Sequence, residues 1–181
     1  KEHGRIWRVT AKGRPLVRPS SGRPSSLADM TVSDLLGKLD SKERWERYQV
    51  KRLLFEKDTN EVVAALDAWV STLKAGDETD EYRRLQALSI YEAHEAPWPD
   101  LLKELLRSPD PKVRAYSTRT LSTWIRDNTG ENTLVDYVAK SGSPAPKVPE
   151  SGRISKADAL FLLETQIADP DPLVRLEAIV A

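Results

Sequence analysis

Residues 101–121 read LLKELLRSPDPKVRAYSTRTL, and residues 161–181 read FLLETQIADPDPLVRLEAIVA. At an offset of 61 positions, the pattern Pro-Asp-Pro-x-Val-Arg of residues 109–114 recurs at residues 170–175. A weaker copy lies at residues 34–54, DLLGKLDSKERWERYQVKRLL, where Arg47 replaces the repeated arginine and Glu46 the valine. The recurrence indicates a repeated helical unit that packs against its neighbours along the chain.

Each part of the repeated pattern has a physical role at the turn between two helices. We expect the aspartate to cap the second helix by accepting backbone N–H groups, and the proline to occupy the first helical position, where no N–H is needed. The valine then enters the core, and the arginine pairs with the capping aspartate of its own or a neighbouring repeat. These residues are Asp110, Pro111, Val113 and Arg114 in one copy, and Asp171, Pro172, Val174 and Arg175 in the other.

Helical periodicity extends over residues 30–181, which we interpret as one all-α domain. Short connections between the helices favour antiparallel neighbours, as in an α-solenoid of helical pairs. The Ser-, Pro- and Gly-rich stretch over residues 141–153 is predicted to be a loop that interrupts the repeats. The expected helices cover residues 31–39, 42–56, 60–74, 80–95, 99–107, 112–127, 131–140, 155–168 and 172–181.

Residues 1–29 differ from the rest and are predicted to form a basic, extended arm. Residues 1–26 contain seven basic residues and one acid, which leaves 21 basic and 27 acidic residues, a net charge of −6, for the remaining 155 positions. The alternation in residues 4–10, GRIWRVT, predicts a strand that has no partner strand in this sequence. Trp7, Arg8 and Arg14 are therefore candidate interaction residues, although the basic side chains also fit a solvated linker or docking on the acidic body.

Both ends of the sequence resemble cut surfaces of a larger molecule. The strand of residues 4–10 is expected to pair with a sheet outside the segment, or to be poorly ordered without it. The last helix ends on apolar residues without a polar closing face, which solenoids need to remain soluble. We therefore expect Leu176, Ile179 and Val180 to be covered by a following repeat or by another copy of the chain.

The sequence contains no recognisable catalytic, cofactor or metal site. It has no cysteine, which excludes disulfides, thiolate metal sites and covalent haem attachment. Its two histidines, His3 and His94, lack a zinc-binding spacing, so a surface position is expected for His94. The acids of residues 77–81 lack calcium-loop spacing and suit a helix N-terminus. The tryptophans are spread one per element, which favours core packing, and no apolar run is long enough to span a membrane.

The Asp-Pro-x-Val-Arg turns resemble those of HEAT repeats. The stretches GRIWRVTAKGRPLV, RYQVKRLL, DAWVSTL and LLRSPDPKVRAYSTRTLSTW resemble the middle of large planctomycete proteins described as membrane-bound dehydrogenases or haem-binding C-x-x-C-H proteins. That resemblance implies a secreted or periplasmic HEAT segment between a propeller-like dehydrogenase domain and a cytochrome c-like domain. Neither the catalytic face of the propeller nor the C-x-x-C-H motif is in this sequence.

Two functional hypotheses follow from the sequence. The first is a non-catalytic scaffold or spacer whose partners are proteins or neighbouring domains of the same polypeptide. The alternative is a nucleic-acid-acting HEAT protein of the alkylpurine DNA glycosylase kind, which would need a strongly basic concave face with an acid and grouped aromatic residues. The net charge of −6 disfavours this alternative, because phosphate neutralisation dominates nucleic-acid affinity.

Overall fold

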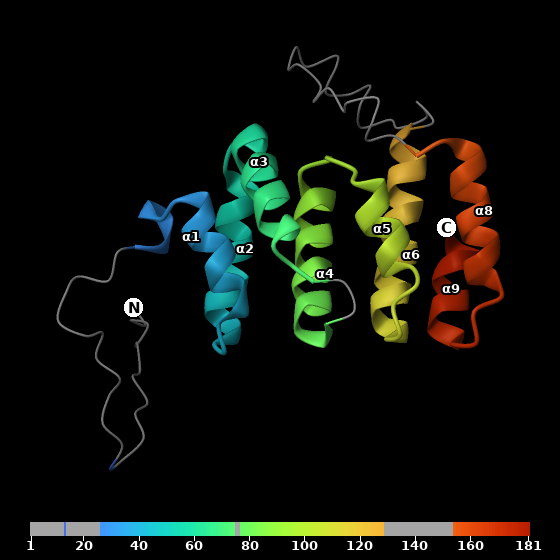
Figure 1. Cartoon of the computed structure of the whole chain (residues 1–181), viewed down its shortest axis with the longest axis horizontal. Coiled ribbons are helices and arrows are strands. Elements are labelled where there is room, and N and C mark those ends of the chain that lie inside the picture. The colour runs from blue at the N-terminus through green and yellow to red at the C-terminus, as the bar shows by residue number, and fades with distance from the viewer. Residues whose placement is uncertain (1–12, 14–25, 75–76, 129–153) are drawn as a thin grey trace, which may run out of the picture.

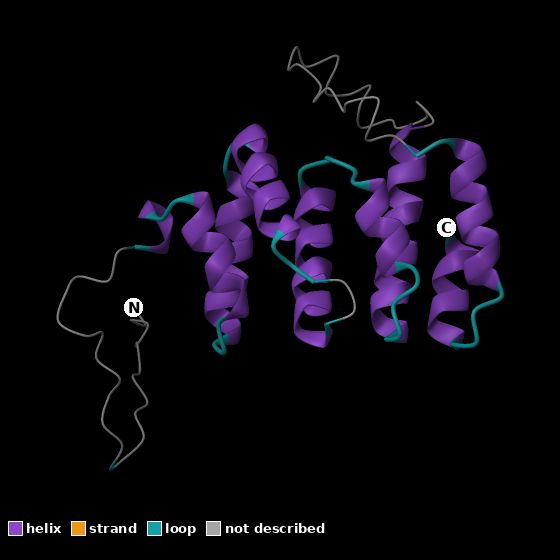
Figure 2. Cartoon of the chain, viewed as in Figure 1, coloured by secondary structure: helices purple, strands orange, loops and turns teal. Residues whose placement is uncertain are grey.

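The described part of the chain is helical throughout (Figure 2). The computed structural model describes residues 13, 26–74, 77–128 and 154–181, in which every regular element is an α-helix or a short 3-10 helix. This confirms the all-α class for these residues. In chain order the elements are η1 (Leu27–Asp29), α1 (Val32–Gly37), η2 (Lys38–Asp40), α2 (Arg44–Glu56), α3 (Thr59–Ser71), α4 (Glu78–Ala93), α5 (Pro99–Leu105), α6 (Pro111–Asn128), α8 (Lys156–Ile167) and α9 (Pro172–Val180).

Some sequence predictions fall outside the described residues. They are the strand expected over residues 4–10, the contacts expected from Trp7, Arg8 and Arg14, the helix expected over residues 131–140, and the loop expected over residues 141–153. Among the described helices, the one expected over residues 31–39 differs most from its prediction. It changes from α-helix to 3-10 helix after Gly37, where glycine has a low helix propensity.

The helices stand side by side in a row (Figure 1). The sequential pairs α1–α2, α3–α4, α5–α6 and α8–α9 are in contact. Contacts also join α2 to α4, α4 to α6, and α6 to α9. The pair α1–α2 lies at one end of the row, and the pair α8–α9 lies at the other. Each helix therefore buries its apolar side against neighbours along the row.

Side-chain caps define where most of these helices begin. The Asp58 carboxylate accepts the backbone N–H groups of residues 60 and 61, and Asp77 accepts those of residues 79 and 80. The acids of residues 77–81 thus lie at a helix start, as predicted. The predicted caps of the repeat are also present: Asp110 accepts from Lys112 N at 2.8 Å, and Asp171 accepts from Leu173 N at 2.8 Å.

One apolar core extends along the row. It reaches from Val32 in α1 to Leu163 in α8, and its largest fully buried side chain is that of Trp124 in α6. The two repeated valines are buried as predicted, with Val113 exposing 5% of its surface and Val174 none. Because α6 contacts α4 and α5 on one side and α8 and α9 on the other, it joins the last pair to the rest of the core.

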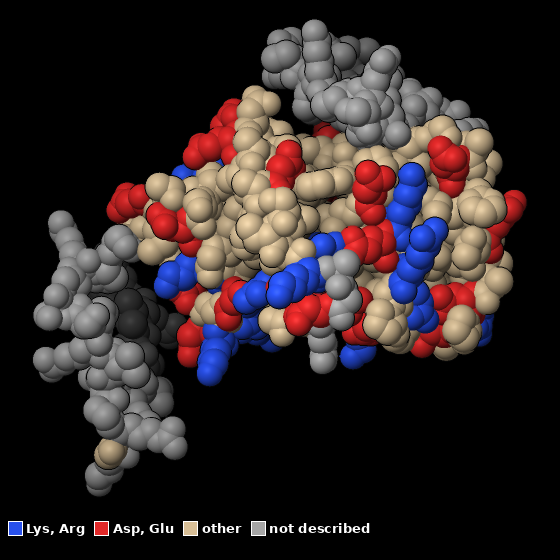
Figure 3. Space-filling model, viewed as in Figure 1, with Lys and Arg blue, Asp and Glu red and all other residues tan. Residues whose placement is uncertain are grey.

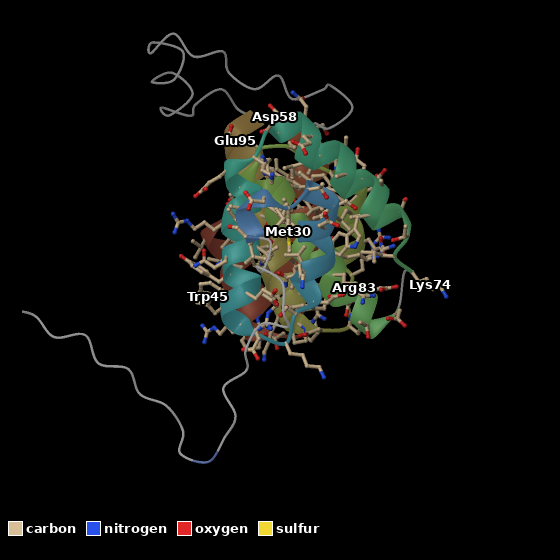
Figure 4. All side chains as sticks on the ribbon, turned by 90° about the vertical axis from the view of Figure 1, so that its left-hand side faces the viewer. Met30, Trp45, Asp58, Lys74, Arg83 and Glu95 are labelled. Atoms are coloured by element: carbon tan, nitrogen blue, oxygen red, sulfur yellow. The ribbon has the colours of Figure 1, made fainter. Side chains whose placement is uncertain are left out.

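Two predicted positions are wrong. Trp45, predicted to pack in the core, is 68% exposed, because α2 turns Val50 and Leu54 inward instead. Figure 4 shows Trp45 at the outer side of α2. His94, predicted at the surface, is buried: its Nε2 lies 3.0 Å from the Leu54 carbonyl oxygen, and its Nδ1 lies 3.1 Å from Thr59 Oγ1. The ring is buried because it satisfies a backbone acceptor near the end of α2.

The capping role of Asp110 predicts a specific loss of stability. Replacing this residue in the variant Asp110→Ala should lower the free energy of unfolding by about 1 kcal/mol, because the first turn of α6 loses its side-chain acceptor. Urea unfolding followed by circular dichroism measures this change. The variant Asp110→Asn should retain most of the stability, because asparagine caps helices about as well as aspartate. Equal stability of the alanine variant and the wild type would contradict the capping role.

Candidate functional site

The same arginine contact closes three turns of the structure. Arg47 Nη1 donates to the carbonyl oxygen of Ser41 at 2.5 Å, and Arg114 Nη1 donates to that of Ser108 at 2.7 Å. Arg175 Nη1 donates to the carbonyl oxygen of residue 169 at 2.8 Å. In each case the acceptor lies six positions before the arginine. The weak copy at residues 34–54 therefore shares the geometry of the two strong copies, despite its different sequence.

A second shared contact fixes the start of each turn. The Ser41 hydroxyl accepts the N–H of Glu43, and the Ser108 hydroxyl accepts the N–H of Asp110. In the third turn the carboxylate of Asp169 accepts the N–H of residue 171 at 2.8 Å. Ser41, Ser108 and Asp169 thus occupy equivalent positions, two residues before the cap. Of these three side chains, only that of Asp169 carries a charge.

That charge links two neighbouring helical pairs. Arg114, at the start of α6, donates from Nε to Asp169 Oδ2 at 2.8 Å and from Nη2 to Oδ1 at 2.9 Å. Both side chains are largely buried, with 14% and 9% of their surfaces exposed. The bidentate hydrogen bond from Arg114 holds the pKa of the Asp169 carboxyl below its usual value.

This pairing corrects the prediction that Arg114 pairs with a capping aspartate. The capping carboxylates of Asp110 and Asp171 already accept N–H groups at their own helix starts. The carboxylate that meets Arg114 is that of Asp169, two positions before a cap, which also accepts the N–H of residue 171. Arg175 contacts the carbonyl oxygens of residues 169 and 170, and it forms no salt bridge with a described residue.

A different ion pair connects the pairs at the other end of the row. Arg83 in α4 contacts the Asp40 carboxylate of η2 at 2.6 Å and the Asp80 carboxylate at 2.7 Å. Asp80 also accepts the backbone N–H of Lys74 at 2.8 Å. Figure 4 shows Arg83 and Lys74 on the same side of the molecule. Charged contacts therefore connect both the first and the last helical pairs to their neighbours.

The last pair exposes a set of large apolar side chains, which we call the end face. It comprises exposed apolar side chains of α8 and α9. Among them Leu176 is 56% exposed, Ile179 71% and Val180 76%. The other members are Leu160, Phe161, Ile167 and Leu173. A group of large apolar side chains on one surface is typical of a protein contact site.

The internal repeat shows what the end face would contact. By the 61-residue offset, Leu176 and Ile179 correspond to Ala115 and Thr118 of α6, which are buried. These two residues share a helical face with Ser122, whose hydroxyl donates to the carbonyl oxygen of Ala181 next to α9. This face of α6 therefore lies against the next pair, whereas the same face of α9 is open.

A groove crosses α2, α4 and α6 on the side of the molecule away from α3 and α5. It has a volume of about 530 Å³ and mainly apolar walls, and Lys51 and Glu92 are charged residues within it. Sequence reasoning missed this groove. The signal was present in α2, because Tyr48, Lys51 and Phe55 follow one another at i, i+3 and i+7 on a face separate from the buried stripe.

The described residues show neither a cluster of metal ligands nor a candidate membrane span. Among residues 26–74, 77–128 and 154–181, no group of three histidine or acidic side chains lies close enough together to hold a metal ion. None of the described helices is long and apolar enough to cross a bilayer. Figure 3 shows acidic and basic side chains beside one another along the lower part of the face in view.

Comparison with known proteins gives no relative. No protein-family model matches the chain, and no curated protein or solved structure matches it significantly. The geometry of the end face, the groove and the arginine turns is therefore the basis for any functional proposal.

The Arg114–Asp169 pair predicts a pH-dependent contribution to stability. The variant Asp169→Asn should lower the free energy of unfolding at pH 7 by on the order of 2 kcal/mol, because it removes charged hydrogen bonds. The pKa of Asp169 is lower in the folded state, so its contribution is complete above the ordinary value of about 3.9 and is lost as pH falls through the folded value.

Urea unfolding at a series of pH values measures this effect. The difference between the wild type and Asp169→Asn should shrink on acidification. The variant Glu164→Gln, which removes an exposed carboxylate from α8, is the matched control and should have little effect at pH 7. A difference between the wild type and Asp169→Asn that is constant from pH 7 to pH 2 would contradict the assigned role.

Proposed function

We propose that this chain is a non-catalytic helical-repeat module that makes protein contacts through its end face. In this proposal the helices form a HEAT-like α-solenoid of antiparallel pairs. The observation that most supports it is the stripe of Leu176 and Ile179, which is open in α9 although the equivalent stripe is buried in α6. Burial of a large apolar side chain contributes about 1.5–3 kcal/mol, so a partner that covers both residues gains substantially.

The occupant that best fits the end face is a further helical pair of the same kind. Arg175 uses Nη1 to close its own turn, as Arg114 does. The Nε and Nη2 groups of Arg114 hold Asp169, and the same groups of Arg175 form no hydrogen bond to a described residue. Such a pair would carry an acidic residue two positions before the N-cap of its second helix. That residue would supply a carboxylate for Arg175, and the helices of the pair would cover Leu176 and Ile179.

A comparison with Arg47 supports an acidic residue in the turn that would follow Arg175. It closes its turn in the same way but forms no salt bridge within the described part of the chain. In the turn that follows it, the position two residues before the cap Asp77 is Ala75 in the sequence. The one pairing of this kind in the described residues joins Arg114 to Asp169, which is why we specify an acid for the partner of Arg175.

The resemblance of the sequence to planctomycete multidomain proteins supports a position of the module within a larger polypeptide. We propose that it spaces a propeller-like dehydrogenase domain from a cytochrome c-like domain in a secreted or periplasmic protein. The redox chemistry would belong to those domains. The role of this segment would be mechanical, because helices packed in a row keep two attached domains at a fixed separation.

The end face gives a direct test of the proposal. The double variant Leu176→Glu/Ile179→Glu should abolish concentration-dependent association of the chain and the binding of an apolar fluorescent dye. Sedimentation velocity and dye fluorescence measure these two properties. The thermal unfolding midpoint should change little, because both side chains are already exposed.

The double variant Ala64→Glu/Ala68→Glu is the matched control. It places two carboxylates on exposed positions of α3, away from the end face, and should leave association and dye binding unchanged. A wild-type chain that stays monomeric at high concentration and binds no dye would argue against a contact role for the end face. Tight binding of duplex DNA that weakens steeply with salt would instead favour the nucleic-acid alternative.

A further inference from the structure

Two cations of α2 line the groove across α2, α4 and α6. Arg52 pairs with Glu56 at 3.2 Å, whereas Lys51 has no carboxylate partner of this kind in the described part of the chain. Lys51 Nζ donates to Ser89 Oγ at 3.3 Å, and it forms no salt bridge with a described residue. An ammonium group has three N–H donors, and Ser89 is the one described residue that accepts from it. Burial lowers the pKa of Lys51, and the like charge of Arg47 on the same helix lowers it further.

The carboxylate within the groove is already engaged. Glu92 Oε2 accepts the phenol O–H of Tyr116 at 2.8 Å and the hydroxyl of Thr120 at 3.3 Å. Arg119 lies over the ring of Tyr116, with its guanidinium carbon 4.8 Å from the ring centre. These contacts tie Glu92 to α6. Glu92 keeps its negative charge but forms no salt bridge with Lys51, so the ammonium group has no direct carboxylate partner among the described residues.

Large aromatic side chains stand around this cation. Tyr48 is 63% exposed and Phe55 is 43% exposed, and both line the groove on the same helix as Lys51. Trp45, three residues before Tyr48, is also on the exposed side of α2. Aromatic side chains of this kind dominate the energetics of protein–peptide contacts.

We propose that the groove binds a segment of a partner protein in which one acidic residue is flanked by large apolar residues. The carboxylate would pair with Lys51, and the apolar side chains would pack on Tyr48 and Phe55. One carboxylate balances one ammonium group. A nucleic acid carries one charge on each successive phosphate, so a single lysine would leave the neighbouring phosphates uncompensated beside apolar walls. The charges and the walls therefore favour a peptide over a nucleic acid. No residue is shared with the end face, so this inference goes beyond the function proposed above.

A short peptide with a central glutamate between leucine and phenylalanine is the probe for this inference. The same peptide with glutamine in place of glutamate is its uncharged match. Fluorescence anisotropy measures the affinity of both peptides for the full chain. The glutamate peptide should bind at least about tenfold more tightly, because a hydrogen bond to a charged group contributes more than a neutral one.

Three variants test whether the preference for the glutamate peptide depends on Lys51. In Lys51→Met the preference for glutamate over glutamine should disappear, whereas in Lys42→Met, which removes an exposed lysine near the same helix, it should persist. The third is the end-face variant Leu176→Glu/Ile179→Glu, which should bind the glutamate peptide as the wild type does. Failure of the end-face proposal and failure of this one are therefore separable.

Two results would overturn the inference. One is equal affinity of the wild type for the glutamate and glutamine peptides, which includes the absence of binding by either. The other is a glutamate preference that survives in Lys51→Met. The thermal unfolding midpoint of Lys51→Met shows whether the variant is still folded. It should be at or above that of the wild type, because the substitution removes an unpaired, partly buried charge.

Discussion

The turn before the second helix of a pair is the constraint on which the rest of the structure depends. An arginine one turn into the helix donates back to the carbonyl oxygen six residues earlier, and a short polar side chain receives the N–H two residues after that carbonyl. Together these contacts fix the angle at which the chain enters the helix. Where Asp169 takes the place of serine, the same turn also binds the preceding pair through Arg114. The side chains of Arg114 and Asp169 thus both close their own turns and join two neighbouring pairs.

The sequence predicted the parts of this arrangement that depend on local chemistry. Aspartate before proline identifies a cap, and the caps at Asp110 and Asp171 lie where the pattern places them. The partner of Arg114 could not be derived in this way, because Asp110, Asp169 and Asp171 are all aspartates near a turn. All three accept a backbone N–H of their own turn, so the choice among them depends on which carboxylate the packing of α6 against the last pair brings to Arg114.

The same reason explains the errors at Trp45 and His94. Both residues lie on helices with several apolar positions, and a sequence pattern does not show which side the neighbouring helix covers. The core side of α2 is fixed by Val50 and Leu54, so Trp45 faces outward. His94 is buried because its ring contacts the Leu54 carbonyl, 40 positions earlier, and the Thr59 hydroxyl. The groove around Lys51 was missed because its walls come from three helices that are distant in sequence.

The position of α6 has a further consequence for motion. This helix contacts pairs on both of its sides, and α8 and α9 meet the remainder of the described chain mainly through it. The last pair can therefore separate from the row as one cooperative unit while the core from α1 to α5 remains closed. Amide hydrogens in α8 and α9 would then exchange through this partial opening, at a lower free energy than those of α4. A partner on the end face would slow their exchange without touching the rest of the molecule.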